Sequence, residues 1–345
     1  MAKKKVTVEK ISGDVLGLAI QSIIKAYGEG VITLLGEHED NKVEVISTGC
    51  LSLDAALGVG GFARGRIYEV YGPNSSGKST LALSVCMNAL QQDLQVAYID
   101  AEHSIDPKLV SNMGKMVNVN PDRMLLVQAF TGDDNLDIAD KLMKTGKVDV
   151  MVIDSVSALL PKGMAEGDIG DNYIGLLARL MSKACLKLMP IANYTNTMLI
   201  FINQIRHSIG KWGDDRVPTG GEALPFYATG RIKVEGGESK NSRIIDDNGV
   251  VIGHACGFEV VKNKLAKPWL TANINLIYGW GYDFTQEAVR LAVDVGILEK
   301  SGAWYYYEDA KVQGEMSIVN FFREHQDKYA VLRNEVKTRL GLSNE

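Results

Sequence analysis

The spacing of apolar and polar residues changes several times along the chain, and each change predicts an element. Between residues 8 and 35, apolar residues recur close to every 3.6 positions, which predicts a helix. Gly28-Glu-Gly30 ends this helix. Because one short helix cannot bury both of its faces, we expect it to dock on its own core or on a neighbouring subunit. The pattern favours neither.

From about residue 45 to 280, short apolar runs alternate with longer helical stretches. The first runs are almost continuously apolar, which is typical of strands covered on both faces in a parallel α/β sheet. They lie at 67–71, 96–100, 148–154 and 198–203. The later runs alternate more and follow one another closely, which indicates an antiparallel extension. They lie at 231–235, 258–262 and 272–277.

The last part of the chain has a different pattern. A helix over 285–295 leads to a strand over 303–307 that looks like half of a hairpin, and a charged helix over 317–340 follows. This order predicts a small α+β domain. The predicted domains are an N-terminal helix and linker over 1–42, an α/β core over 43–282 and the C-terminal domain over 283–345.

Composition describes an ordinary globular protein, with 46% apolar and 23% charged residues. No apolar run is long enough to span a bilayer, and the basic N-terminus has no apolar stretch of a secretory signal, so we expect no membrane association. The four cysteines are scattered, without zinc-site or disulfide spacing, which favours a reducing cytoplasm. The net charge of −5 does not exclude a nucleic-acid partner, because a local basic groove is enough to bind one.

A glycine-rich motif follows the first predicted strand. Residues 72–79 match the phosphate-loop pattern G-x-x-x-x-G-K-[ST] and precede a helix predicted over 80–91. Backbone N–H groups of such a loop wrap around the β- and γ-phosphates, and the helix dipole adds to the attraction. Lys78 supplies a positive charge and Ser79 a hydroxyl for Mg²⁺, so ATP and Mg²⁺ are the predicted cofactors. The predicted loop contacts are Gly72, Pro73, Asn74, Ser75, Ser76, Gly77, Lys78, Ser79 and Thr80.

Three further strands end in polar residues. Asp154 is placed to orient Mg²⁺, although an aspartate there is more often a helix cap. Glu102 is placed to polarise the attacking water, although alone it would be an exposed loop residue. Gln204 can contact the γ-phosphate and report its presence to the segment behind it. Together with the phosphate loop, these residues predict a nucleotide-hydrolysing site.

Two segments, 160–175 and 205–222, are polar, contain glycine and lack periodicity. They are long for loops inside a compact domain, which marks them as functional or mobile.

Several motifs together resemble the bacterial RecA recombinase family. They are residues 46–54 (Ile-Ser-Thr-Gly-Cys-Leu-Ser-Leu-Asp), 71–79, 99–103 (Ile-Asp-Ala-Glu-His), 154–159 (Asp-Ser-Val-Ser-Ala-Leu), 201–206 (Phe-Ile-Asn-Gln-Ile-Arg), 219–221 (Thr-Gly-Gly) and 261–264 (Val-Lys-Asn-Lys). The resemblance runs from about 10 to 340 without large insertions. It implies a RecA-type P-loop core and an ATP-dependent recombinase that acts in DNA repair and the SOS response. It also implies helical filaments on single-stranded DNA, which exchange strands with homologous double-stranded DNA.

The resemblance assigns roles around the nucleotide. It makes Glu102 the general base and Gln204 the γ-phosphate sensor, while Asp154 and Ser79 hold Mg²⁺. The remaining assigned residues are Asp106 and Tyr278 at the adenine, and Lys262 and Lys264, which cross to the neighbour's γ-phosphate.

The resemblance also assigns a DNA interface. The two long segments become DNA-binding loops, at about 164–175 and 205–219. The residues that match DNA contacts are Ile174 and Ile209, as wedges between base triplets, and Arg179, Arg206, Gly220 and Gly221, at phosphates. The N-terminal helix resembles an oligomerisation arm that packs on the next subunit, and Phe226 falls at an interface position.

The chain departs from the family pattern in four places. Leu109 stands where a tyrosine usually stacks on the adenine, and Ser208 stands where a loop lysine is usual. The second loop is about one residue shorter and contains Trp212, for which base stacking and loop packing remain equally supported. The chain ends without a long acidic tail, so we expect easier loading onto duplex DNA; this ending fits a phage-encoded version of the family, and the sequence leaves a bacterial or phage origin open.

Two other functions compete with this interpretation. A ring-shaped helicase would share the phosphate loop and Glu102, but usually lacks the Lys262–Lys264 pair and the small C-terminal domain. An ATP-gated DNA scaffold would not need Glu102. His103 and His207 are interpreted as structural, because no metal-binding cluster surrounds them in the sequence.

Overall fold

The computed structural model describes residues 15–28, 31–32, 43–168, 175–207, 216–237 and 242–342. Two units, Met1–Glu44 and Val45–Glu345, are described separately. In the first unit, helix α1 spans Val15–Tyr27, within the stretch 8–35 whose pattern predicted a helix, and residues 8–14 lie outside the described residues. Val15, Leu16 and Leu18 on this helix are exposed. Within the described residues, no helix combines the length and apolar character needed to cross a membrane.

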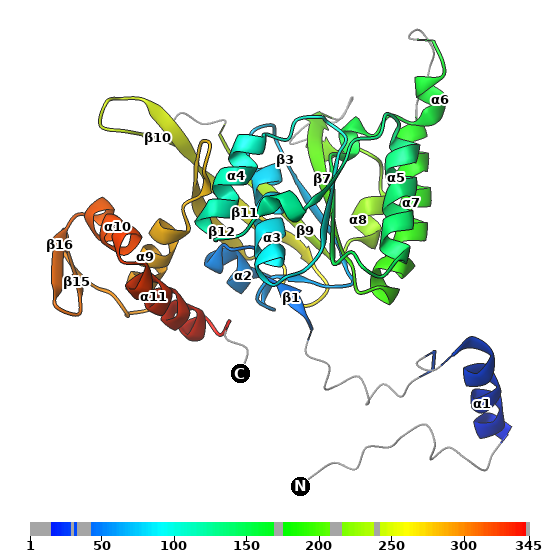
Figure 1. Ribbon diagram of the computed structural model, residues 1–345, viewed down its shortest axis with the longest axis horizontal. Coiled ribbons are helices and arrows are strands. Elements are labelled where there is room, and N and C mark those ends of the chain that lie inside the picture. The colour runs from blue at the N-terminus through cyan, green and yellow to red at the C-terminus, as the bar shows by residue number, and fades with distance from the viewer. Residues whose placement is uncertain are drawn as a thin grey trace. The chain divides into compact units, whose positions relative to one another are not determined.

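The second unit contains a large mixed sheet with the strand order β13-β12-β11-β9-β3-β7-β6-β4-β5 (Figure 1). Its strands are β3 (Ile67–Gly72), β4 (Val96–Asp100), β5 (Leu125–Val127), β6 (Val150–Asp154), β7 (Met198–His207), β9 (Gly230–Gly236), β11 (Val251–Asn263), β12 (Thr271–Ile277) and β13 (Gly281–Tyr282). The neighbouring strands β9, β3, β7, β6, β4 and β5 are parallel to one another. The pairs β9–β11, β11–β12 and β12–β13 are antiparallel. The predicted mostly parallel sheet with an antiparallel extension is confirmed.

One strand of the predicted extension belongs to the parallel part instead. β9 pairs in parallel with β3, with Tyr68 opposite Gly230. The antiparallel pairing begins only with β11, where Phe258 lies opposite Val234. The alternating pattern of β9 was misleading, because a strand between two others can still leave some side chains half-buried.

Helices cover both faces of the sheet (Figure 1), which explains the nearly continuous apolar strands. Side chains of one face, such as Val70 and Tyr98, pack in a cluster with α2 (Leu51–Leu57), α3 (Lys78–Gln91) and α4 (Pro107–Met116). Ile99 and Phe201 point to the other face. The helices of that second cluster are α5 (Gly132–Lys144), α7 (Leu176–Tyr194) and α8 (Ala223–Tyr227).

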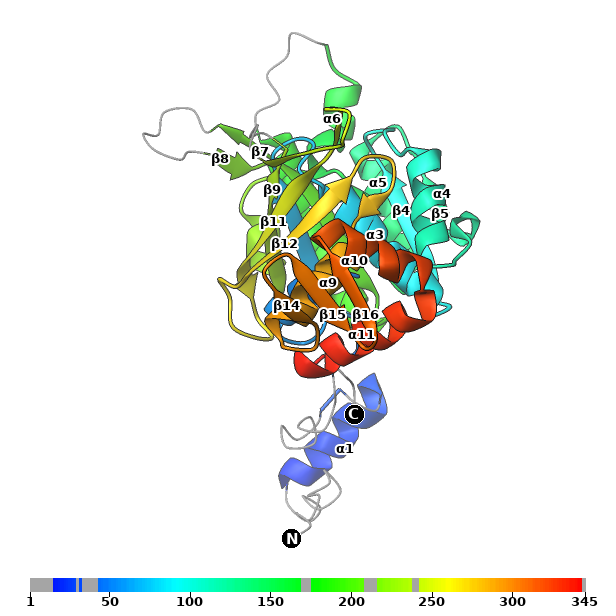
Figure 2. The same ribbon diagram turned by 90° about the vertical axis from the view of Figure 1, so that its left-hand side faces the viewer.

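The two long segments contain more regular structure than the sequence predicts. In the first, residues Lys162–Ala165 form the short helix α6, and a 3-10 helix, η4 (Val156–Ala158), lies just before the segment. In the second, β7 continues to His207 and pairs with β8 (Arg216–Pro218), so an entirely irregular loop is wrong (Figure 2). The apolar run ends before the strand does, because backbone pairing with β8 extends β7 beyond that run.

The remaining short strands are edge pairs. β1 (Val45–Ile46) pairs with β2 (Phe62–Ala63), and β10 (Arg243–Ile245) forms a hairpin with β11. A further 3-10 helix, η3 (Pro121–Arg123), precedes β5.

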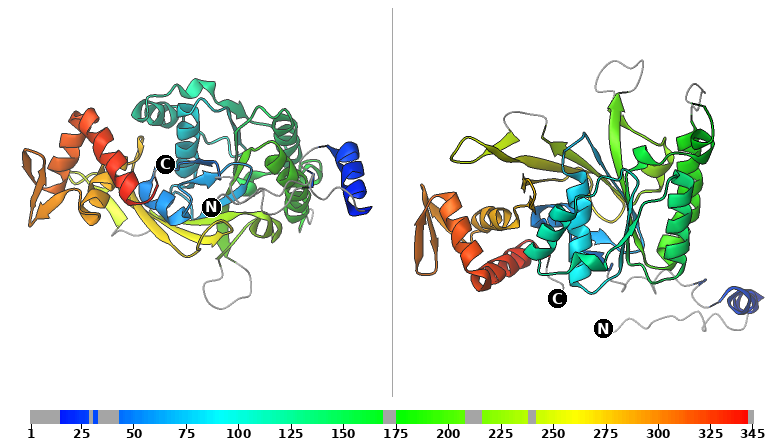
Figure 3. Two further views of the ribbon diagram at one scale, coloured as in Figure 1. Left: turned by 90° about the horizontal axis from the view of Figure 1, so that it is seen from below. Right: turned by 45° about the horizontal axis from the view of Figure 1, so that its top comes forward.

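The C-terminal region contains helices and a small sheet, as predicted, at one end of the second unit (Figure 3). Its elements are α9 (Phe284–Asp294), β14 (Glu299–Ser301), β15 (Trp304–Tyr307), β16 (Ala310–Gln313), α10 (Glu315–Glu324) and α11 (Gln326–Arg339). The single helix predicted over 317–340 is wrong, because His325 has non-helical φ and ψ of −115° and 76° and separates two helices. The charged pattern hides this break, since it continues on both sides.

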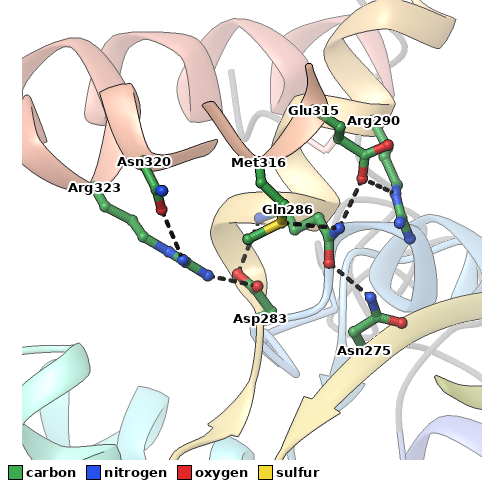
Figure 4. A network of polar contacts seen from close by, with 8 residues as sticks. All are labelled: Asn275, Asp283, Gln286, Arg290, Glu315, Met316, Asn320 and Arg323. Carbon is green, nitrogen blue, oxygen red and sulfur yellow. Dashed lines mark hydrogen bonds and ion pairs between the residues drawn. The ribbon is translucent and has the colours of Figure 1, made fainter. Parts of the chain in front are cut away.

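Polar contacts join α9 to the core sheet and to α10 (Figure 4). The Asp283 carboxylate accepts hydrogen bonds from the Gln286 backbone N–H at 3.1 Å and from Arg323 at 2.6 Å. The Gln286 side chain accepts from Asn275 of β12 at 2.6 Å and donates to Glu315 at 2.7 Å. These contacts fix the C-terminal region against β12 of the core sheet.

A second junction depends on the buried carboxylate of Glu287. It accepts hydrogen bonds from the backbone N–H groups of Leu51 and Ser52 at 3.0 and 2.9 Å, and from the Ser52 hydroxyl at 2.7 Å. These groups form the N-terminus of α2, where a negative charge is favourable. Glu287 therefore caps a core helix from the C-terminal region.

Glu287→Gln should lower the free energy of unfolding by about 2 kcal/mol. The charge-assisted hydrogen bonds become neutral, and the NH₂ group of the glutamine side chain would face N–H donors of α2 instead of accepting from them. Denaturant titration measures this loss. The matched variant Glu299→Gln, on an exposed strand, should stay within about 0.5 kcal/mol of the parent. Equal effects of the two variants would contradict the capping role.

Candidate nucleotide and DNA site

The glycine-rich motif forms the turn between β3 and α3. Gly77 precedes the helix with a φ of +103°, in the region that favours glycine. Lys78 is the first residue of α3 and is buried, and its Nζ donates to the Pro73 carbonyl at 2.6 Å. Burial lowers the pKa of Lys78, whereas the charges of Asp154 and Glu102 raise it. The ammonium group therefore lies inside the loop and is attracted by the charges of both carboxylates.

Two side chains support the loop from behind. The Tyr282 hydroxyl donates to the Gly77 carbonyl at 2.9 Å, and Cys256 Sγ donates to the Ser76 carbonyl at 3.2 Å. A Cβ atom on Gly77 would lie 3.0 Å from the Tyr282 hydroxyl, so this close support requires glycine. The buried Ser76 hydroxyl has no hydrogen-bond partner among the described residues.

Asp154 lies at the end of β6, next to the start of α3. Its carboxylate accepts a 2.6 Å hydrogen bond from the Tyr98 hydroxyl. Burial raises the pKa of Asp154, and hydrogen bonds from Tyr98 and Ser79 oppose this shift. The Ser79 hydroxyl and the Asp154 carboxylate thus lie together, as the metal prediction requires.

These two oxygen donors suit Mg²⁺, which binds one or two protein groups together with phosphate oxygens and water. No group of three or more His, Cys, Asp or Glu side chains that could hold a metal ion occurs in the part of the chain that the structure describes.

The segment that carries Glu102 is held at both ends. The backbone N–H groups of Ala101 and Glu102 donate to the Asp154 carbonyl at 2.7 and 3.3 Å. The buried Asp100 carboxylate accepts from the N–H groups of Ser104 and Ile105 at 3.0 and 3.2 Å. The turn around Glu102 is therefore fixed to the strands on either side of it.

The structure brings Glu102 and Gln204 into direct contact. Gln204 Nε2 donates to Glu102 Oε1 at 2.7 Å. The Ser155 hydroxyl donates to the same carboxylate oxygen. Sequence reasoning did not single out Ser155, although it directly follows Asp154. The peptide bond between these two residues is cis.

A buried polar network continues from Gln204 into the core. The Asn203 amide donates to Glu69 and to the Thr219 carbonyl, both at 2.9 Å, and its oxygen accepts from the Thr219 hydroxyl at 2.6 Å. The fully buried Glu69 carboxylate is paired with Arg231 Nε at 2.6 Å. Sequence reasoning missed Glu69 and Arg231, because their partners are far away in the chain.

The lysine pair lies at the end of β11. Lys262 Nζ donates to the carbonyls of Pro225 and Phe226 at 2.6 and 2.9 Å, at the end of α8. Burial lowers the pKa of Lys262, and the charge of Lys264 reinforces this shift. β11 ends at Asn263, so Lys262 lies on this strand and Lys264 follows it. A bulge before Lys262 disturbs the strand and ends the regular alternation.

The two predicted adenine contacts, Asp106 and Tyr278, lie on different elements of the core. Asp106 caps α4, and its carboxylate accepts from the Lys108 N–H at 2.8 Å. Tyr278 follows β12 and is 51% exposed. Its hydroxyl lies 3.2 Å from His254 Nδ1. Leu109 is partly buried and packs against the core cluster of α3 and α4.

The structure describes part of the predicted DNA interface. Gly220 and Gly221 have φ of +85° and +77°. Cβ atoms on them would lie 2.8 Å from Val156 and 3.0 Å from Ala178, so this segment packs on η4 and the start of α7. Arg179 lies on the same first turn of α7. Arg206 lies on β7, with its backbone opposite Val217. The predicted contacts outside the described residues are Ile174 and Ile209, together with Ser208 and Trp212.

Comparisons with known proteins agree over nearly the whole chain. Residues 14–283 match the family model of the RecA N-terminal domain, and residues 286–341 match that of the RecA C-terminal domain. The chain is 42% identical to Protein RecA of Streptococcus sanguinis, over 99% of this chain and 91% of that protein. It is 41% identical to Protein RecA of Bacillus subtilis, over 95% and 92% of the two chains. A crystal structure of the RadB recombinase is 26% identical, with a TM-score of 0.53, over 69% of this chain and 98% of that one.

Proposed function

The chain belongs to the RecA family, and we infer from this that it forms a helical filament on single-stranded DNA and exchanges strands with homologous double-stranded DNA. Membership makes it an ATP-dependent recombinase and a DNA-dependent ATPase. A ring-shaped helicase is not favoured, because a RecA C-terminal domain follows the core. Free, buried cysteines support the proposal that it acts in the cytoplasm.

The contact between Gln204 and Glu102 carries the proposed mechanism. Glu102 is the general base that takes a proton from the attacking water, and Ser155 keeps its carboxylate in place. Lys78 neutralises phosphate charge inside the loop. Mg²⁺, when bound by Ser79 and Asp154, supplies further charge compensation at the phosphates. The Gln204 amide donates to Glu102. A bound γ-phosphate offers the same amide group a second acceptor.

A change at Gln204 can reach the DNA-binding segment through its neighbour. Gln204 N donates to the Asn203 oxygen at 2.9 Å, and the same oxygen accepts from the Thr219 hydroxyl at 2.6 Å. Gly220 and Gly221 follow directly. We propose that the state of the nucleotide sets the position of this segment, and with it the contacts of Arg179, Arg206, Gly220 and Gly221 with DNA phosphates. Ile174 and Ile209 would separate the bases.

Strand exchange is the experiment that tests this function. With ATP and Mg²⁺, the protein should transfer a strand from a homologous duplex to bound single-stranded DNA, and not from a heterologous duplex. Electron microscopy with a slowly hydrolysed ATP analogue should reveal long filaments. Closed rings, or unwinding that ignores homology, would contradict the proposal and favour a helicase.

A further inference from the structure

His254 connects the predicted base-binding residue with the phosphate loop. It lies on β11, beside β12, and its side chain is only 2% exposed. Its Nδ1 lies 3.2 Å from the Tyr278 hydroxyl, and the two ring centroids are 5.7 Å apart. Tyr278 itself is 51% exposed. The tyrosine ring is therefore open to a ligand, while its hydroxyl is held by a buried group.

The other side of the His254 ring lies against the phosphate loop. A Cβ atom on Gly237 would lie 3.1 Å from the Ser75 carbonyl oxygen and 3.6 Å from His254 Nε2. Burial lowers the pKa of His254, and the backbone of Ser76 is close enough to oppose that shift. Two residues further along β11, Cys256 donates to the Ser76 carbonyl. The imidazole thus occupies the space between Tyr278 and the Ser75–Ser76 backbone.

A buried histidine needs polar partners that an apolar side chain of similar size would not need. The Ser76 backbone lies close to the His254 ring, but no partner of Nε2 meets hydrogen-bond geometry within the described part of the chain. The hydrogen bond to Tyr278 is the interaction that an apolar residue could not make.

We propose that His254 is a positioning residue for the nucleotide. It fixes the Tyr278 ring relative to the phosphate loop, so that the base and the triphosphate of one nucleotide are bound at a set separation. This inference rests on the proposed function as an ATPase, and on the assignment of Tyr278 to the adenine by resemblance to the family. It predicts an effect on base-containing nucleotides and none on a triphosphate without a base.

The test compares ATP with inorganic tripolyphosphate in the ATPase reaction on single-stranded DNA. His254→Leu and Tyr278→Phe should each raise the KM for ATP by roughly 2- to 10-fold, which corresponds to the loss of one neutral hydrogen bond. The kcat should not change. The inhibition constant of tripolyphosphate should stay within about 2-fold, because no base is involved.

Combined variants identify the pair itself. The double variant His254→Leu/Tyr278→Phe should be no worse than either single variant, because both remove the same bond. His254→Asn, whose amide reaches the position of Nδ1, should restore the KM. Tyr278→Phe changes an exposed ring and keeps the test valid even if His254→Leu folds poorly. Additive effects, or equal weakening of ATP and tripolyphosphate, would overturn the inference.

Two further variants separate this inference from the proposed function. Cys256→Ala removes the other contact of β11 with Ser76, so it should change ATP and tripolyphosphate affinity equally. A Cys256→Ala effect confined to ATP would overturn the inference. Tyr278→Ala should raise the KM for ATP more than Tyr278→Phe. An unchanged KM in Tyr278→Ala would show that the base binds elsewhere, and the assignment of Tyr278 in the proposed function would fail.

Discussion

Glu102→Gln should lower DNA-dependent ATP hydrolysis by roughly 10²-fold or more, while ATP and DNA binding remain. The two side chains have nearly the same shape, and glutamine keeps an oxygen that can accept from Ser155 or Gln204. What is lost is the basicity needed to take a proton from water. Because hydrolysis loosens the proposed filament, filaments of this variant should also last longer on single-stranded DNA.

Steady-state phosphate release and equilibrium nucleotide binding together measure this effect. The control is Glu324→Gln, which makes the same change on an exposed surface of α10 and should leave turnover unchanged. Ser155→Ala, which removes one donor to Glu102, should reduce turnover less than Glu102→Gln does. Turnover near the parent value in Glu102→Gln would rule out Glu102 as the base.

The mostly parallel sheet and the polar residues at its strand ends could be predicted from the sequence because of a physical regularity. Parallel strands covered on both faces are apolar throughout, and polar residues appear where they end. Asp154 and Glu102 could therefore be placed near the phosphate loop before their distances were known. The register of β4 and β6 puts Asp100 opposite Asp154, and Glu102 follows two residues later.

What the sequence could not predict depends on contacts between distant residues. Glu69 looks like a polar residue within a strand, yet it is buried because Arg231 and Asn203 bind its carboxylate from two other strands. Glu287 caps a helix that begins 236 residues earlier in the chain. His254 and Ser155 also acquire their partners only through folding. No local pattern distinguishes such residues from exposed ones.

The lysine pair shows why strand periodicity alone could not predict the local geometry. Regular strand alternation places residues two apart on one face, but β11 ends between Lys262 and Lys264. The charge of Lys264 and burial both lower the pKa of Lys262, and its ammonium group donates to two uncharged carbonyls.

An anion from another subunit would compensate this charge. Lys262 is held by the carbonyls of Pro225 and Phe226, and the Phe226 side chain beside it is 72% exposed. Phe226 is also the residue that the resemblance to the family places at an interface between subunits. We therefore expect Lys262 and Lys264 to act on the γ-phosphate bound by the next subunit, and not on that of their own phosphate loop.

Mixing two inactive variants tests that expectation. Lys262→Ala/Lys264→Ala should be nearly inactive as an ATPase on single-stranded DNA, as should Glu102→Gln. In a random equimolar filament, about a quarter of the head-to-tail interfaces join an intact Glu102 to an intact lysine pair, so activity should return to roughly that fraction of the parent value. Each variant alone, at the same total concentration, gives the baseline.

The control for the lysine variant is Lys141→Ala/Lys144→Ala, which removes two exposed lysines from α5, leaves the buried Asp140 paired with Lys187, and should remain active by itself. Co-assembly must be measured independently, for example by energy transfer between labelled variants. If the variants co-assemble and activity does not return, the lysines act within their own subunit or outside the chemistry. Recovery can occur only if one active site contains Glu102 of one subunit and the lysines of its neighbour, because neither variant supplies both groups.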